Sequence, residues 1–175
     1  GFEHDSCGVG FIAHLDGEPR HSIVHEGIKI LQNLQHRGAV GGDSLTGDGA
    51  GIMVQLPDGF FKKECKHLKL PEFGKYAVGM FFLPTEEKTA ALCKHIVSDV
   101  IAQQGAEITG WRTVPVDNSR LGELATSTEP SIEQIFITSG LWDENRFQRK
   151  LYIIRRLIEK KIEQVTEKDL SQFYI

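Results

Sequence analysis

The chain lacks a surplus of basic residues, a long apolar run and a secretory signal. Lysine and arginine total 20 against 24 aspartates and glutamates, which gives the 175 residues a net charge of −4. Such a charge disfavours nucleic acid as a partner. The longest apolar stretches, such as 76–83, are far shorter than the roughly 20 residues that a membrane-spanning helix needs. No basic segment leads into an apolar one near residue 1, so we expect a cytoplasmic protein without a nucleic acid or membrane partner.

Cysteine is scarce as well. The three cysteines, Cys7, Cys65 and Cys93, are odd in number and widely spaced, which argues against a disulfide framework and for a reducing compartment. Cys65 and Cys93 each stand two residues before a histidine, but these triplets do not have a common zinc-ligand spacing. We therefore expect no metal site in this chain.

Cys7 is the candidate nucleophile. It precedes Gly8, Val9 and Gly10, and an apolar run follows. A cysteine at the head of a mature chain can use its own α-amino group as the base, because that amine has a pKa of roughly 7.7 to 8. The chemistry would be acyl transfer through a thioester, with Gly8 leaving room for a substrate. The alternative is that Cys7 is a small, inert core residue.

The first third of the chain predicts a strand, a helix, a loop and a second strand. The apolar run over 8–15 indicates a strand, and a turn follows at 16–19. Apolar residues at helical spacing predict a helix that begins at Ser22 as its N-cap and ends before Gly38. Six glycines between positions 38 and 51 predict a loop, and 51–56 reads as a strand.

The rest of the chain alternates between strand and helix patterns, which indicates an α+β domain. In order, we expect a short helix within 60–74, a strand over 76–83, a helix from an N-cap at Thr85 to a stop at Gly105, strands over 107–116 and 132–138, and a helix over 141–162. Seven basic residues lie on the last helix. They are most simply a solvated face, and a ligand-binding patch is the alternative.

Three segments together resemble a known family. They are Cys7-Gly8-Val9-Gly10-Phe11, His36-Arg37-Gly38-Ala39 and Gly47-Asp48-Gly49-Ala50-Gly51. In order and spacing they resemble the start of the class II glutamine amidotransferase domain of glutamate synthase large subunits. This resemblance implies the N-terminal-nucleophile hydrolase fold, an αββα sandwich in which two antiparallel sheets pack face to face under covering helices.

The resemblance also implies roles for the site residues. Cys7 would attack the side-chain amide of glutamine, while Arg37 and Gly38 would lie beside it and orient both reactants. Gly8, Gly47, Asp48 and Gly49 would shape the site. From the residues alone, Arg37 and Gly38 are equally a favourable helix end, and Asp48 could simply fix its own loop through backbone hydrogen bonds.

Two features lead us to expect an incomplete domain. Residues 1–6 resemble a leader that is removed before Cys7, or else are an extraneous remnant. While they are attached, the Cys7 nitrogen is an amide that cannot accept a proton. The family also needs an Asn-Gly pair as its oxyanion hole, and none of Asn33, Asn118 and Asn145 precedes a glycine. We therefore interpret 7–175 as the N-terminal portion of the domain, inactive alone and prone to self-association through exposed strand edges.

The function that the resemblance implies is hydrolysis of glutamine to glutamate and ammonia. Downstream residues or a partner chain would complete the domain, and the ammonia would serve the reductive amination of 2-oxoglutarate. The resembled enzymes use FMN, an iron-sulfur cluster and NAD(P)H or ferredoxin, none of which has a binding motif in this chain. Two alternatives stay open: a non-catalytic binding or assembly domain on the same scaffold, and a class II amidotransferase of purine or amino-sugar synthesis.

Overall fold

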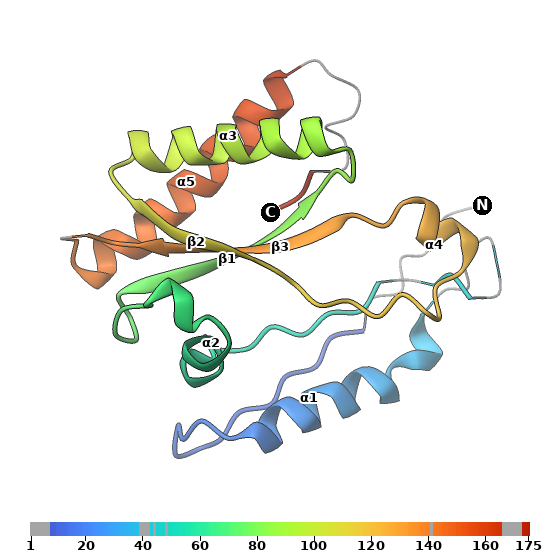
Figure 1. The fold of residues 1–175 in the computed structure, drawn as a ribbon. Coiled ribbons are helices and arrows are strands. Elements are labelled where there is room, and N and C mark those ends of the chain that lie inside the picture. The colour runs from blue at the N-terminus through green and yellow to red at the C-terminus, as the bar shows by residue number, and fades with distance from the viewer. Residues whose placement is uncertain (1–7, 39–42, 44, 48, 141, 166–172) are drawn as a thin grey trace. The chain divides into compact units, whose positions relative to one another are not determined.

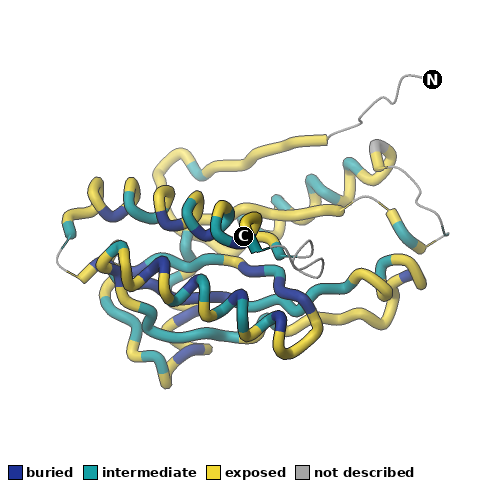
Figure 2. The backbone as a smooth tube through the Cα atoms, turned by 90° about the horizontal axis from the view of Figure 1, so that it is seen from above, coloured by how far each residue is buried: buried dark blue, intermediate teal, exposed yellow. Residues whose placement is uncertain are grey.

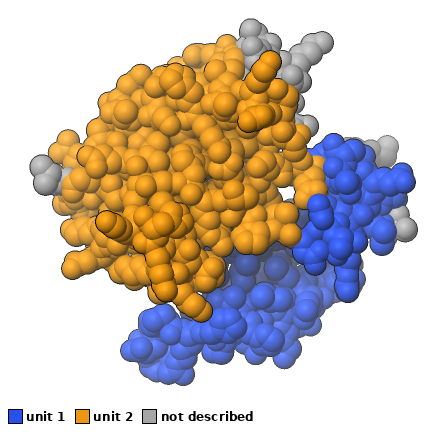
Figure 3. All heavy atoms as spheres, in the orientation of Figure 1, with its two compact units in different colours: residues 1–55, 117–128 blue, residues 56–116, 129–175 orange. Residues whose placement is uncertain are grey.

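The computed structural model describes the chain except for residues 1–7, 39–42, 44, 48, 141 and 166–172. The chain divides into two compact units (Figure 3). Unit 1 is 1–55 with 117–128, and unit 2 is 56–116 with 129–175. Each unit has its own secondary structure and is described separately.

Unit 2 is built on a three-stranded antiparallel sheet with the order β1-β3-β2. The strands are β1 (Tyr76–Leu83), β2 (Glu107–Thr113) and β3 (Ser131–Thr138). The register pairs Tyr76 with Thr138 at one end of β1 and Leu83 with Ser131 at the other. The β2 pairing is irregular between Ile108 and Gly110. All three strands were predicted from the sequence, and the bounds of β1 agree with the expected 76–83.

Two long helices, α3 (Glu87–Gln103) and α5 (Glu144–Gln164), cover one face of this sheet (Figure 1). Both were predicted, and both turn an apolar stripe towards the strands. The core between helices and sheet is fully apolar in its buried members, which are Phe81, Leu83, Cys93, Val97, Val100, Ile101, Ala106, Ile135, Ile137, Phe147, Ile154, Ile158 and Ile162. Burying each large side chain contributes about 1.5 to 3 kcal/mol, so this core supplies most of the stability of unit 2.

A second, smaller core lies on the other face of the sheet. Helix α2 (Asp58–Glu64) and the 3-10 turn η2 (Lys66–Leu68) follow one another there. Phe61 and Cys65 pack against Tyr76 and Phe136, and the rings of Phe61 and Phe136 meet edge to face with centroids 5.2 Å apart. The sheet is therefore held from both sides at this end.

Local features fix both ends of α3. The N-cap of α3 is Glu86, whose carboxylate accepts a hydrogen bond from the backbone N–H of Thr89 at 2.6 Å. The expectation of Thr85 as the cap was wrong by one residue, because the longer glutamate side chain reaches the free N–H groups of the first turn. Gly105 follows the end of α3 with a φ of +77°, as the predicted stop requires.

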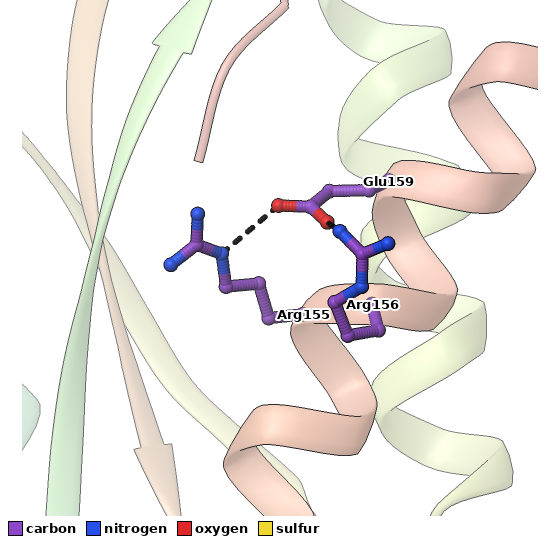
Figure 4. Close-up of polar contacts among 3 residues, drawn as sticks. All are labelled: Arg155, Arg156 and Glu159. Carbon is purple, nitrogen blue, oxygen red and sulfur yellow. Dashed lines mark hydrogen bonds and ion pairs between the residues drawn. The ribbon is translucent and has the colours of Figure 1, made fainter.

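Charged side chains lie on the exposed surface of α5, as predicted. Arg155 and Arg156 both approach Glu159 (Figure 4). Glu159 accepts a hydrogen bond from Arg155 Nε at 2.9 Å and another from Arg156. The hydrogen bond from Arg155 lowers the pKa of the Glu159 carboxyl. Arg155 and Arg156 are thus engaged along their own helix, as is ordinary for a charged surface. Lys150 and Lys161 donate instead to Gln104 and Gln103 at the end of α3.

Unit 1 contains α1 (His21–Asn33), the 3-10 turn η1 (Gln35–Arg37) and the short helix α4 (Glu123–Ser127). Helix α1 was predicted, although Arg20 and not Ser22 precedes its first turn. Helix α4 was not predicted. Its five residues carry no apolar periodicity, so no pattern in the sequence indicated it.

The strands expected over 8–15 and 51–56 were wrong. The described residues of both segments have no strand assignment, and their side chains are largely exposed (Figure 2), with Phe11 at 93% and Met53 at 98%. An apolar run indicates a segment that can join a sheet, but a strand also needs a neighbouring backbone to pair with. The expected turn is present, because Gly17 donates to the His14 carbonyl at 3.0 Å with a φ of +70°.

The described residues thus form one sheet and not the two of an αββα sandwich. Within the same residues, every helix is too short or too polar to cross a bilayer.

Removing a core side chain of α5 tests the main core. Ile158 is fully buried, so Ile158→Ala should lower the free energy of unfolding by about 2 to 5 kcal/mol. Ile153 on the same helix is 42% exposed, so Ile153→Ala should cost less than about 1 kcal/mol and serves as the control. Urea denaturation followed by tryptophan fluorescence measures both. Equal costs would contradict the packing described here.

The two described cysteines should be inert in the folded chain. Burial raises the pKa of the Cys93 thiol to about 11 and also raises that of Cys65. A thiol of pKa about 11 holds roughly 10²-fold less thiolate at pH 8 than one of pKa about 8.5. Because the unfolded thiol ionises first, the stability that Cys93 contributes should fall as the pH rises from about 8.5 towards 11.

Peptide mass mapping after brief treatment with iodoacetamide at pH 8 measures this reactivity. We expect Cys65 and Cys93 to stay unlabelled in buffer and to react fully in urea. Rapid labelling of Cys93 in buffer would show that its thiol is accessible in the folded chain, which would contradict the packing described here.

Candidate functional site

The segment that follows the candidate nucleophile lies along α1. Cys7 itself is outside the described residues, but Gly8 and Gly10 are within them. A Cβ on Gly8 would lie 3.2 Å from the Leu34 side chain, and one on Gly10 would lie 2.6 Å from Cγ2 of Ile30. The second distance is shorter than a methyl group tolerates, and the β-branched Ile30 has little freedom to move away. Glycine at position 10 therefore allows a close approach of backbone to helix.

The end of α1 leads directly to the two residues expected beside the nucleophile. Leu34 closes α1, and Gln35 to Arg37 form the turn η1. The structure thus brings Gly8 against a residue that stands three positions before Arg37. The side chain of Arg37 is outside the described part of the chain, so its role stays a prediction.

Gly38 ends η1 without the left-handed conformation that a glycine cap usually has. Its N–H donates to the Gln35 carbonyl at 3.1 Å, and its φ of −76° is open to any residue. The interpretation of Gly38 as a helix-ending residue is confirmed for the 3-10 turn, but its backbone angle does not demand glycine.

The glycine-rich loop is described only in part. Gly47 and Gly49 are exposed, and a Cβ on Gly49 would meet open space. Asp48 lies outside the described residues. Packing among the described residues therefore does not explain glycine at position 49, and its expected part in shaping the site stays a prediction.

Asp43 organises this loop, and sequence reasoning missed it. Its Oδ1 accepts hydrogen bonds from the backbone N–H groups of Leu45 at 2.9 Å and Thr46 at 2.7 Å. Its Oδ2 accepts from the Thr46 hydroxyl at 2.8 Å and from the Leu124 backbone N–H at 3.2 Å. Three of these bonds close a local turn, and the fourth reaches a residue 81 positions away in sequence.

The fourth bond places the Asp43 carboxylate at the start of α4. Gly122 is the N-cap of that helix, and its backbone N–H groups at the first turn include that of Leu124. A Cβ on Gly122 would lie 2.2 Å from Oδ1 and 2.7 Å from Oδ2 of Asp43. Gly122 therefore leaves the space that the carboxylate occupies.

These hydrogen bonds stabilise the ionised form of Asp43. The Thr46 hydroxyl lowers the pKa of the Asp43 carboxyl most, followed by the backbone N–H groups of Leu124 and Leu45. Since the pKa is lowered in the folded state, the contribution is present above the unfolded value of about 3.9 and is lost as the pH falls through the folded value. Asp43 is consequently an anion at neutral pH.

Part of this arrangement had a signal in the sequence. An aspartate three residues before a threonine in a glycine-rich loop, as in Asp43 and Thr46, is typical of a local side-chain-to-backbone turn. The bond to Leu124 had none, because no sequence pattern joins residues so far apart.

The described residues contain no group of three His, Cys, Asp or Glu side chains close enough to hold a metal ion. What they offer is a support in three parts: a backbone segment packed on α1, a 3-10 turn that ends at Arg37, and a glycine-rich loop anchored at Asp43. Covalent chemistry at Cys7 with its own amine as the base would need only such a support from these elements.

A family model of class-II glutamine amidotransferases matches residues 7–175, so the match begins at Cys7. It covers all three segments that carry the resemblance.

Several glutamate synthases are similar to this chain. The large chain of the NADPH-dependent glutamate synthase of Bacillus subtilis is 47% identical over 160 residues, which are 90% of this chain. That of Azospirillum brasilense is 47% identical over an alignment of 178 positions, which covers 99% of this chain. A ferredoxin-dependent glutamate synthase of Arabidopsis thaliana is 37% identical over 163 residues.

The chain spans about a tenth of the length of these relatives, 10% and 11% for the two bacterial proteins. The expected resemblance to the amidotransferase domain of glutamate synthase is confirmed. With a match over nearly its whole length, the chain belongs to the class II glutamine amidotransferase family, whose domains are of the N-terminal-nucleophile hydrolase type.

Proposed function

We propose that this chain forms part of a glutaminase site that releases ammonia from glutamine. The observation that carries the proposal is the family match over residues 7–175, which starts at the candidate nucleophile. The similarity to glutamate synthases favours this class II enzyme over those of purine or amino-sugar synthesis.

In the proposed reaction, Sγ of Cys7 attacks the side-chain carbonyl carbon of glutamine. The α-amine of Cys7 takes the thiol proton and passes it to the leaving nitrogen, so that the carbon–nitrogen bond breaks and ammonia departs. Water then attacks the γ-glutamyl thioester, which releases glutamate and returns the proton to the thiol. Each step needs a free amine on Cys7, so residues 1–6 must be removed first.

The remaining site residues take the roles that the family resemblance implies. Arg37 presents a planar set of donors that suits the carboxylate of a bound glutamine. Gly38 and Gly8 let that substrate approach the backbone, and Gly47, Asp48 and Gly49 shape the site. An Asn-Gly pair supplied by other residues or by a partner chain would stabilise the oxyanion, a contribution of about 10²- to 10³-fold in rate.

We further propose that the complete domain is an αββα sandwich. The apolar segments 8–15 and 51–55 support this, because their side chains are largely exposed and their backbone has no strand assignment. A second sheet would bury those side chains and pair that backbone. Until that sheet is complete, these segments are sites for self-association.

The ammonia would pass to a synthase region outside this chain, where 2-oxoglutarate is aminated. We assign to that region the FMN, the iron-sulfur cluster and the reductant. The names of the relatives given above specify NADPH or ferredoxin as the electron donor, so the donor for this protein has more than one precedent. The amidotransferase chemistry itself needs none of these groups.

Substitution of the nucleophile tests the proposal. In the complete protein that carries this sequence, Cys7→Ala should lower glutaminase turnover by at least about 10³-fold, because no other group can form the thioester. Glutamate release from glutamine, followed with a coupled assay, measures this. The same variant should still use added ammonia for synthesis, since that step does not pass through Cys7.

Cys93→Ala is the matched control. It removes a buried thiol from the core of unit 2, so it should cost about 1 kcal/mol of stability and leave turnover unchanged. Full glutaminase activity in Cys7→Ala would contradict the proposal and favour a non-catalytic role for the domain.

A further inference from the structure

We infer that Asp43 is a positioning residue of the glutamine site, acting through its hydrogen bond to the N–H of Leu124 at the start of α4. This inference rests on the proposed function and concerns the same site. Asp43 is not itself among the residues of the three family segments, and its carboxylate acts on the loop that carries Gly47 and Gly49.

The Asp43 carboxylate makes two separable sets of hydrogen bonds. Oδ1 holds the local turn through the N–H groups of Leu45 and Thr46. Oδ2 accepts from Leu124 and from the Thr46 hydroxyl. The local bonds shape the loop, whereas the bond to Leu124 fixes the loop against a second segment of unit 1.

In the sequence, Asp43 lies between the two groups of expected site residues. Arg37 and Gly38 stand five or more positions before Asp43, and Gly47 to Gly49 stand four to six positions after it. Loops rich in glycine have many accessible conformations, so ordering one is costly in entropy. A single anchored residue near its middle removes much of that freedom before the substrate binds.

Gly122 packs closely against the Asp43 carboxylate and the Thr46 hydroxyl. Any larger residue would place a Cβ 2.2 Å from Oδ1 and 2.6 Å from the Thr46 hydroxyl oxygen. The backbone of Gly122, with φ −71° and ψ 166°, is open to alanine. Substitution there would therefore act through the carboxylate and not through backbone strain.

These observations give two variants that break the bond to Leu124 in different ways. Asp43→Asn can keep its oxygen in the local turn, but its amide nitrogen cannot accept from Leu124. Gly122→Ala keeps Asp43 and displaces its carboxylate. If the hydrogen bond to Leu124 orders the loop, the two variants should raise KM for glutamine to a similar extent.

Two controls match these changes. Asp117→Asn alters an aspartate of the same unit whose carboxylate accepts from the N–H of Ser119, two residues away. Gly59→Ala adds a methyl group where nothing lies within 4 Å. Both should leave KM and kcat unchanged.

The experiment compares glutaminase kinetics of the complete protein with thiol alkylation at Cys7. We expect Asp43→Asn and Gly122→Ala to raise KM for glutamine by about tenfold while kcat changes less than about threefold, because a pre-ordered binding loop is lost and the nucleophile is not. An electrophilic analogue of glutamine should alkylate Cys7 more slowly by a similar factor. Iodoacetamide, which needs no glutamine pocket, should react at the wild-type rate.

Hydrogen exchange at the Leu124 amide gives an independent readout of the bond itself. Faster exchange in both variants, together with the KM effect, supports the inference. Unchanged KM in an active protein overturns it, and so does an equal slowing of both alkylating reagents, which would indicate general loss of structure. If the wild-type protein has no glutaminase activity, the proposed function fails and the positioning role fails with it, while exchange at Leu124 still reports whether the bond exists.

Discussion

The central strand β3 is the element on which unit 2 depends. It pairs with a neighbour along each edge and is packed on both faces. Ile135 and Ile137 enter the core below α3 and α5, and Phe136 enters the smaller core against Phe61 and Tyr76. A strand with both faces buried needs apolar side chains on both faces. Residues 134 to 137 of β3 are four consecutive buried positions, and three of them are apolar. Only Gln134 among them is polar, and Arg112 donates a hydrogen bond to its side chain at 2.8 Å.

Unit 1 is organised on a different principle. Its described residues form helices and extended segments without a sheet, and the extended segments expose most of their apolar side chains. Its described contacts include close packing of glycine backbone on α1 at Ile30 and Leu34, and the hydrogen bond of the Asp43 carboxylate to α4. The residues expected to carry the chemistry all belong to this unit. In the proposed function, the chemistry would therefore depend on the unit whose described residues include no buried large apolar side chain, where single polar contacts matter most.

The sequence predicted the elements of unit 2 because each one is determined locally. The apolar run of β1 stands between Gly74 and Pro84, and α3 shows a helical stripe and a glycine stop at Gly105. The errors arose where structure depends on distant partners. The segments 8–15 and 51–56 have strand composition but no paired backbone in the described structure, and α4 is too short to have a period.

The residues of the candidate site likewise fall into those that the sequence predicted and those that only the structure revealed. Cys7 and the two glycine-rich segments were found from residue type and family resemblance. The family match covers all of them, and their roles in the site stay predictions. Asp43 was missed because its decisive partner, Leu124, is 81 residues away and contributes only a backbone N–H. The tertiary structure alone reveals such a contact, since any residue but proline could supply the donor.

The central claim is that Cys7, with a free α-amine, forms a thioester with the γ-glutamyl group. Acid quenching of the complete protein during turnover of isotope-labelled glutamine, followed by peptide mass mapping, tests it directly. The account predicts a labelled γ-glutamyl thioester on a peptide that begins at Cys7. Labelled acyl group on any other residue, or an active protein in which Cys7 still follows Ser6, would contradict it.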